Sequence, residues 1–66
     1  MRIADRDKPR FEQLDDQRRR IDDDFNDLVQ QMRDGSIRDV DLARNRAQFL
    51  HVRHEGLIRE MVELLA

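Results

Sequence analysis

Apolar residues recur along the chain at alternating steps of three and four, in two stretches that Asp34-Gly35-Ser36 separates. Positions with this spacing lie on one side of an α-helix, where they can pack along a partner helix. The first stretch runs through Phe11, Leu14, Arg18, Ile21, Phe25, Leu28 and Met32. The second runs through Val40, Ala43, Ala47, Leu50, His54, Leu57, Met61 and Leu64. The pattern predicts an all-α fold, an antiparallel two-helix hairpin of the coiled-coil kind.

Local signals set the expected ends of the two helices. Pro9 suits a first helical turn because its missing N–H has no partner there in any helix. Gly35 accepts the left-handed backbone that closes a helix, and Ser36 with Asp39 resembles a capping box for the next one. We expect a flexible segment at 1–7 and a hairpin at 8–66, with helices at about 9–33 and 37–65 and a turn at 34–36.

An antiparallel register follows from a turn centred near Gly35. The facing pairs are Leu28 with Ala43, Phe25 with Ala47, Ile21 with Leu50, Leu14 with Leu57, and Phe11 with Met61. Large residues opposite small ones near the turn predict a close approach of the helices there. The same register places Arg18 opposite His54, a polar layer that would set the register at some cost in stability. Asp15, Asp22 and Glu55 lie beside this layer and could neutralise it.

The second helix has more apolar surface than one partner helix can cover. Ile58, Val62 and Leu65 widen its seam face, and Leu42, Phe49 and Val52 lie roughly on the opposite side. These six residues form the predicted partner-binding surface, although scattered exposed apolar residues are the simpler interpretation of the second set. A covered surface would mean either pairing of the chain with itself, as a dimer or tetramer built on a four-helix bundle, or docking on another protein.

Composition supports association and gives no hint of chemistry. Sixty-six residues allow one domain near the lower limit of independent folding, and the absence of cysteine excludes disulfides and thiolate sites. The net charge of −2 provides no general attraction to nucleic acid. No apolar run approaches the ~20 residues of a membrane helix, and the first seven residues lack the apolar core of a secretory signal. We expect a soluble, cytoplasmic protein that does not bind membranes.

No constellation of residues points to catalysis, so we expect no enzyme, cofactor or small-molecule substrate. His51 and His54 stand three apart with Glu55 adjacent, but a metal site needs a further placed ligand. Surface or seam histidines are the favoured interpretation. Ser36 is the only serine and resembles a cap rather than a nucleophile.

Arginines are abundant, and carboxylates four residues away are expected to neutralise many of them. The expected pairs are Asp15–Arg19, Asp16–Arg20, Arg18–Asp22, Arg19–Asp23 and Arg20–Asp24. Together with the run Arg18-Arg19-Arg20, Arg44, Arg46 and Arg53 form the only basic cluster. RNA binding on one charged face of a hairpin dimer, as in Rop-type regulators, is therefore kept as the alternative function.

The chain resembles the YdcH-like group of small bacterial proteins. The resemblance rests on Lys8-Pro9-Arg10-Phe11-Glu12-Gln13-Leu14, on Ile21-Asp22 and on the stretch from Arg53 to Leu65. It departs from the group at Arg53 and His54, where lysines are usual, and at the usual histidine of the first helix. The resemblance implies a short helical hairpin and no assigned activity.

The chain is also similar, at fewer positions, to YscE-type cochaperones of type III secretion. The similarity lies in the length and in a hairpin with a glycine turn, here Met32-Arg33-Asp34-Gly35. It implies a protein that keeps an aggregation-prone subunit soluble within a heterocomplex. An adaptor or cochaperone role is thus one form of the expected protein–protein interaction module.

Overall fold

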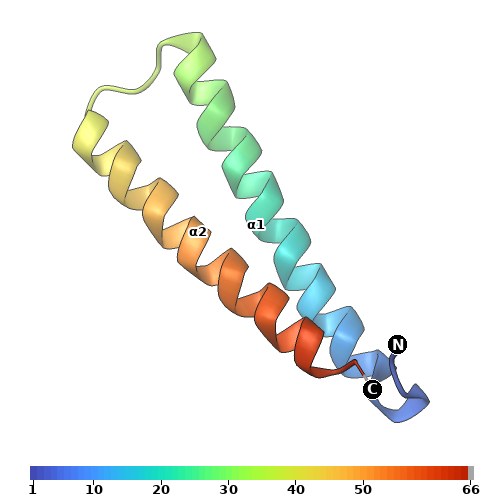
Figure 1. The fold of residues 1–66 in the computed structure, drawn as a ribbon. Helices are drawn as coiled ribbons and strands as arrows, with labels where there is room; N and C mark the ends of the chain where they lie inside the picture. Colours follow the sequence, from blue (N-terminus) through green and yellow to red (C-terminus); the bar gives the residue numbers. More distant parts are fainter. Residues whose placement is uncertain (66) are drawn as a thin grey trace.

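The computed structural model describes residues 1–65, which form a two-helix hairpin (Figure 1). A short 3₁₀ turn, η1 (Asp5–Asp7), leads into α1 (Lys8–Asp34), and α2 (Val40–Glu63) returns beside it. The molecule is an elongated rod of 46 × 16 × 15 Å. The all-α hairpin is confirmed, and residue 66, the last of the predicted hairpin, lies outside the described residues.

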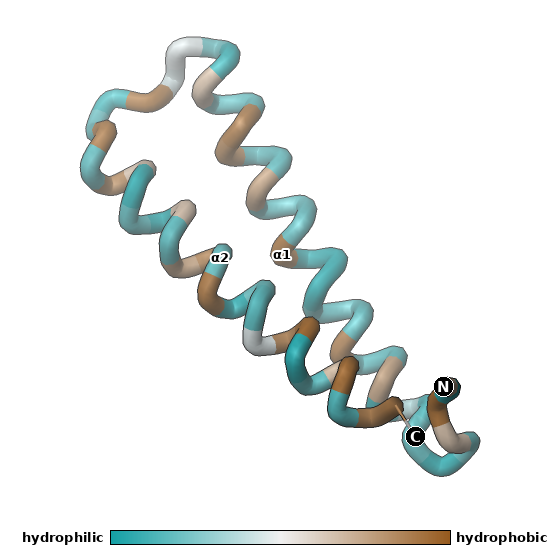
Figure 2. Tube along the Cα trace, in the orientation of Figure 1, coloured by the Kyte–Doolittle hydropathy of each residue, from teal (hydrophilic) through white to brown (hydrophobic). Residues whose placement is uncertain are grey.

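The buried core lies in the middle of the rod and in the half nearer the chain termini. Leu14 and Ile21 from α1 pack with Leu50 and Leu57 from α2, and each is at most 8% exposed. These four residues form two of the facing layers that the antiparallel register predicts. Phe25, Met61 and Leu64 pack against the cluster from its edges. Figure 2 shows the resulting pattern, with apolar positions recurring along both helices between polar ones.

The end of α1 agrees with the prediction. Gly35 has φ 71°, a left-handed conformation, and its N–H donates to the carbonyl of Met32. The N–H of Ser36 donates to the carbonyl of Gln31, which completes the Schellman arrangement at a helix end. Glycine is needed here because a Cβ atom disfavours this backbone conformation.

The predicted start of the second helix is wrong by three residues. Asp39, rather than Ser36, is the N-cap: its backbone is extended and its side chain accepts a hydrogen bond of 3.1 Å from the N–H of Leu42. Ile37 and Arg38 therefore belong to an irregular connection and not to the helix. An aspartate at the N-cap can accept a hydrogen bond from the free N–H three residues later. In the shorter turn that the sequence predicts, Asp39 would lie inside the helix and could not act as its N-cap.

This longer connection accompanies a divergence of the two helices toward the turn (Figure 1). Met32 and Val40, the seam residues nearest the turn, are 56% and 64% exposed. The prediction that α1 and α2 approach each other closely at this end is therefore wrong, and the two seam residues nearest the turn are exposed to solvent. Leu28 is still buried, and it lines a hollow together with Ile37 from the connection.

The N-terminal segment folds back along the end of α2. Ile3 and Leu65 form an isolated antiparallel backbone bridge, and α2 ends at Glu63, so Leu65 lies just beyond the helix. An ion pair of 3.3 Å between Arg10 and Glu60 joins the helices at the same end. The predicted flexibility of residues 1–7 concerns motion and stays a prediction. In the described part of the chain, neither helix has the length and apolar character that crossing a bilayer requires.

Candidate partner-binding surface

All six residues of the predicted partner-binding surface are exposed in the single chain. Leu42, Phe49, Val52 and Val62 are between 56% and 66% exposed, and Ile58 and Leu65 are 38% and 37% exposed. By contrast, α1 leaves only Val29 and Met32 exposed among its large apolar residues. The excess of apolar surface therefore lies on α2, as the sequence indicates.

The six residues do not form one surface. Leu42 and Phe49 are seven residues apart and lie on the same side of α2. Val52 follows buried Leu50 by two residues, about 200° around the helix, and so points away from α1. Ile58 and Val62, four apart, lie on the flank opposite to Leu42 and Phe49. The helix thus presents two separate apolar flanks, and only one of them borders a depression.

That depression consists of two hollows along one side of the seam between α1 and α2. The hollow nearer the turn is lined by Leu28, Gln31, Ser36, Ile37, Arg38, Asp39, Leu42, Ala43 and Arg46. The second hollow is lined by Gln17, Arg20, Ile21, Asp24, Phe49, Leu50 and Arg53. Exposed Leu42 and Phe49 each stand at the edge of one hollow. We call the two hollows together the interhelical groove.

The two hollows are repeats of one another at an interval of seven residues. Leu42, Ala43 and Arg46 in the first hollow correspond to Phe49, Leu50 and Arg53 in the second. On α1, Leu28 corresponds in the same way to Ile21. Residues seven apart return to the same side of a helix after about two turns. The two hollows of the interhelical groove therefore lie on the same face, with an exposed apolar residue and an arginine in each repeat.

Four arginines line the interhelical groove, and none of them makes an ion pair within residues 1–65. They are Arg20, Arg38, Arg46 and Arg53. The sequence gives the reason for two of them: the neighbours of Arg46 and Arg53 at steps of three and four are apolar residues or glycine. No carboxylate on their own helix can reach them. The expectation that nearby acids neutralise many of the arginines therefore does not hold on this face, and for Arg46 and Arg53 the spacing already shows it.

One of these arginines, Arg53, lies over the aromatic ring of Phe49. The guanidinium carbon of Arg53 lies 5.8 Å from the ring centroid of Phe49, within the range of a cation–π contact. An exposed contact of this kind contributes about 0.5–1 kcal/mol. It leaves the N–H donors of Arg53 directed to solvent or to a ligand, because no protein acceptor binds them in the described residues.

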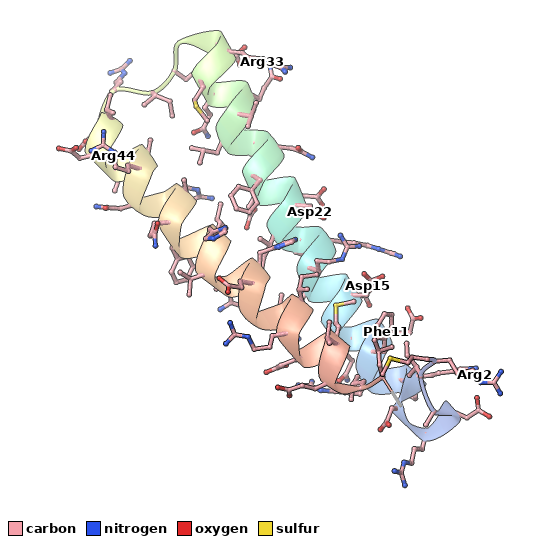
Figure 3. All side chains as sticks on the ribbon, viewed as in Figure 1. Arg2, Phe11, Asp15, Asp22, Arg33 and Arg44 are labelled. Atoms are coloured by element: carbon pink, nitrogen blue, oxygen red, sulfur yellow. The ribbon has the colours of Figure 1, made fainter. Side chains whose placement is uncertain are left out.

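The opposite side of the seam carries the predicted polar layer. Arg18 binds Asp15 at 2.8 Å and Asp22 at 2.6 Å. Figure 3 labels these two aspartates, which lie seven residues, or about two turns, apart on α1. His54 approaches the same Asp22 at 3.3 Å and lies edge-on to the ring of Phe25. The structure thus brings Arg18 and His54 to one carboxylate, that of Asp22. The hydrogen bond to Asp15 raises the pKa of Arg18 above its usual value. The register-setting role of the layer stays a prediction.

Only some of the predicted intrahelical ion pairs form. Asp15–Arg19 and Arg18–Asp22 are present at 3.0 and 2.6 Å. The pairs that would involve Asp16, Asp23 and Asp24 do not form in the described residues; Arg19 binds Asp15 in place of Asp23. Arg20, without either of its expected partners, lines the interhelical groove.

The histidines do not gather metal ligands. His51 lies 4.0 Å from Glu55, and His54 is turned to Asp22 instead. Within residues 1–65, no group of three or more histidine, aspartate or glutamate side chains is placed to hold a metal ion.

Comparison with known proteins adds no relative to this picture. No family model matches the chain, and neither curated proteins nor solved structures give a significant match. The resemblances to the YdcH-like group and to YscE-type cochaperones therefore stay predictions.

Proposed function

We propose that this protein is a small, non-enzymatic protein–protein interaction module, which acts by burying one side of α2 against a partner. The single observation that carries the proposal is the exposure of Leu42 and Phe49 at the edges of the interhelical groove. Large apolar side chains grouped beside a depression are typical of a surface that another protein covers. A homo-oligomer and an adaptor or cochaperone are both forms of this function.

The test is a charge placed at the centre of this surface. Phe49→Asp should lower the mass of the oligomer, measured by sedimentation equilibrium, or abolish capture of partner proteins from the native host. Its far-UV circular dichroism should stay helical, because Phe49 is not part of the buried core. Gln48→Asp adds the same charge at the adjacent exposed position and should change neither readout. Unchanged mass together with unchanged capture in Phe49→Asp would contradict the proposal.

RNA binding is the second candidate, favoured by the four arginines of the interhelical groove that lack carboxylate partners. Binding through phosphate contacts would weaken steeply as salt rises. A titration of structured RNA at two salt concentrations separates the candidates: an affinity that Arg46→Gln and Arg53→Gln lower, with a steep salt slope, would favour RNA over a protein partner.

A further inference from the structure

We infer that the interhelical groove binds an acidic amphipathic helix of another protein, with carboxylates on the flanks of an apolar stripe. This inference deepens the proposed function and rests on it. It specifies the chemistry of the partner, whereas the proposed function specifies only that a partner covers α2.

The interhelical groove carries an excess of positive charge. Four arginines and two aspartates, Asp24 and Asp39, line the interhelical groove, which makes it formally cationic on a chain whose net charge is −2. Asp39 is already occupied, since its carboxylate accepts the N–H of Leu42 as the cap of α2. The N–H groups of these arginines thus outnumber the carboxylate oxygens in the interhelical groove. Carboxylates of a partner could accept charge-assisted hydrogen bonds from them.

The spacing of the residues that line the interhelical groove matches a helical partner. Leu42 and Phe49 are seven residues apart, and Arg46 and Arg53 repeat at the same interval. A helix laid along the interhelical groove presents its own side chains at that period, so apolar residues at seven-residue steps would meet Leu42 and Phe49 together. Glutamates on either side of that stripe would then face Arg46 and Arg53. An extended peptide, with a period of two, would not match this repeat.

A second copy of the chain fits the interhelical groove less well. Two copies facing each other through this side would set arginines against arginines. The outward side of α1, which carries Glu12, Asp16, Asp23 and Asp27, is acidic but offers no large exposed apolar residue to cover Leu42 and Phe49. The flank of Ile58 and Val62 on a second copy is apolar, but docking it in the interhelical groove would be a head-to-tail contact that leaves open chains unless it closes into a ring. A segment of a different protein satisfies both requirements without that constraint.

A nucleic acid is also disfavoured. The same acidic side of α1 and the net charge of −2 repel a long polyanion. Phe49 is the one exposed phenylalanine of the described residues, with the Arg53 guanidinium 5.8 Å from its ring centroid, so the face offers no row of phenylalanine rings on which successive bases could stack. A short acidic helix avoids the long-range repulsion because its charges stay within the interhelical groove.

The experiment selects binders from a displayed library against the intact 66-residue chain. The library consists of helical peptides of about 18 residues, long enough for five turns. Leucines are fixed at seven-residue spacing, and the flanking positions vary freely among glutamate, glutamine and lysine. We expect selected peptides to be enriched in glutamate at the flanking positions. Mapping of their contacts by amide chemical shifts should place them along Leu42, Arg46, Phe49 and Arg53.

A matched pair of double variants then tests the arginines. Arg46→Gln with Arg53→Gln removes two charges from the interhelical groove. Arg44→Gln with Arg59→Gln removes two charges from the same helix at exposed sites that already pair with Asp41 and Glu55. The first variant should weaken the selected peptides by about tenfold, and the second by less than about twofold.

Each other outcome overturns the inference in a distinguishable way. Enrichment in lysine, or no charge preference, would refute an acidic partner; if Phe49→Asp still abolished binding, the proposed function would stand. Equal effects of the two double variants would show a general charge effect rather than a site. If no binder were selected and the chain formed dimers that Phe49→Asp dissociates, the occupant would be a second copy. Structured RNA that binds with the same dependence on Arg46 and Arg53, where peptides fail, would refute both proposals.

Discussion

His54 Nε2 on α2 lies 3.3 Å from Asp22 Oδ1 on α1, and the other oxygen of that carboxylate binds Arg18 at 2.6 Å. One aspartate therefore links the arginine of the first apolar stripe to the histidine of the second. The side chains of Arg18 and His54 are about one-third exposed, so water also solvates their charged and polar groups. Ion pairs that solvent reaches to this extent contribute little to the free energy of unfolding.

Replacing the histidine should therefore stabilise the hairpin. His54→Leu fills the same place with an apolar side chain against Phe25 and should raise the free energy of unfolding by about 1 kcal/mol. Asp22 keeps Arg18 as its partner and is not left unpaired. Urea denaturation followed by circular dichroism measures the change, and His51→Leu at an exposed position is the control. A clear loss of stability in His54→Leu would show that the contact with Asp22 contributes more than burial does.

The two glycines should respond in opposite directions. Gly35→Val should destabilise by about 1–2 kcal/mol, because its φ of 71° is a left-handed conformation that a β-branched residue resists. Gly56→Ala should instead stabilise by up to about 1 kcal/mol, since it lies within α2 and an added Cβ meets no atom within 4 Å. Thermal unfolding of the two variants beside the wild type measures both. A destabilised Gly56→Ala would indicate that an unseen partner approaches the backbone at this position.

The start of α2 can be tested through its cap. Asp39→Ala removes the acceptor of the Leu42 N–H and should cost about 1 kcal/mol. Ser36→Ala should be nearly neutral, because Ser36 lies in the connection and caps no helix in the structure. Both are measured by chemical denaturation. The reverse order of the two effects would restore the helix start that the sequence predicts.

The core is tested by truncating one leucine in it and one outside it. Leu14→Ala, at a side chain only 1% exposed, should destabilise by about 2–4 kcal/mol. That is a large share of the stability of a domain this small, so much of the helical signal should be lost. Leu42→Ala, at 66% exposure, should leave the helical signal and the unfolding midpoint of the isolated chain almost unchanged. Equal losses would mean that Leu42 is covered in solution by a second copy.

Much of the fold could be predicted because its determinants are local or periodic. Gly35 ends α1 through its own backbone conformation, and the alternating steps of three and four place Leu14, Ile21, Leu50 and Leu57 on facing sides. The exposure of Leu42 and Phe49 follows from the same periodicity, since they lie off the seam. The lack of a local carboxylate partner for Arg46 and Arg53 was also present in the spacing, although it was missed.

The relative placement of the two helices was decided only by the tertiary structure. The divergence toward the turn exposes Met32 and Val40 and accompanies the start of α2 at Asp39, and no pattern within one helix specifies the angle to another. Which arginines bind Asp15 and Asp22 also depends on side-chain placement in three dimensions: Arg18 binds both carboxylates, and Arg19 shares Asp15. The sequence by itself thus determined where the helices form and which residues are buried, because both depend on the periodicity of apolar residues along the chain. The tertiary structure decided that Arg20 and Arg53 border one groove with Phe49, because only the packing of α1 on α2 brings their flanks together.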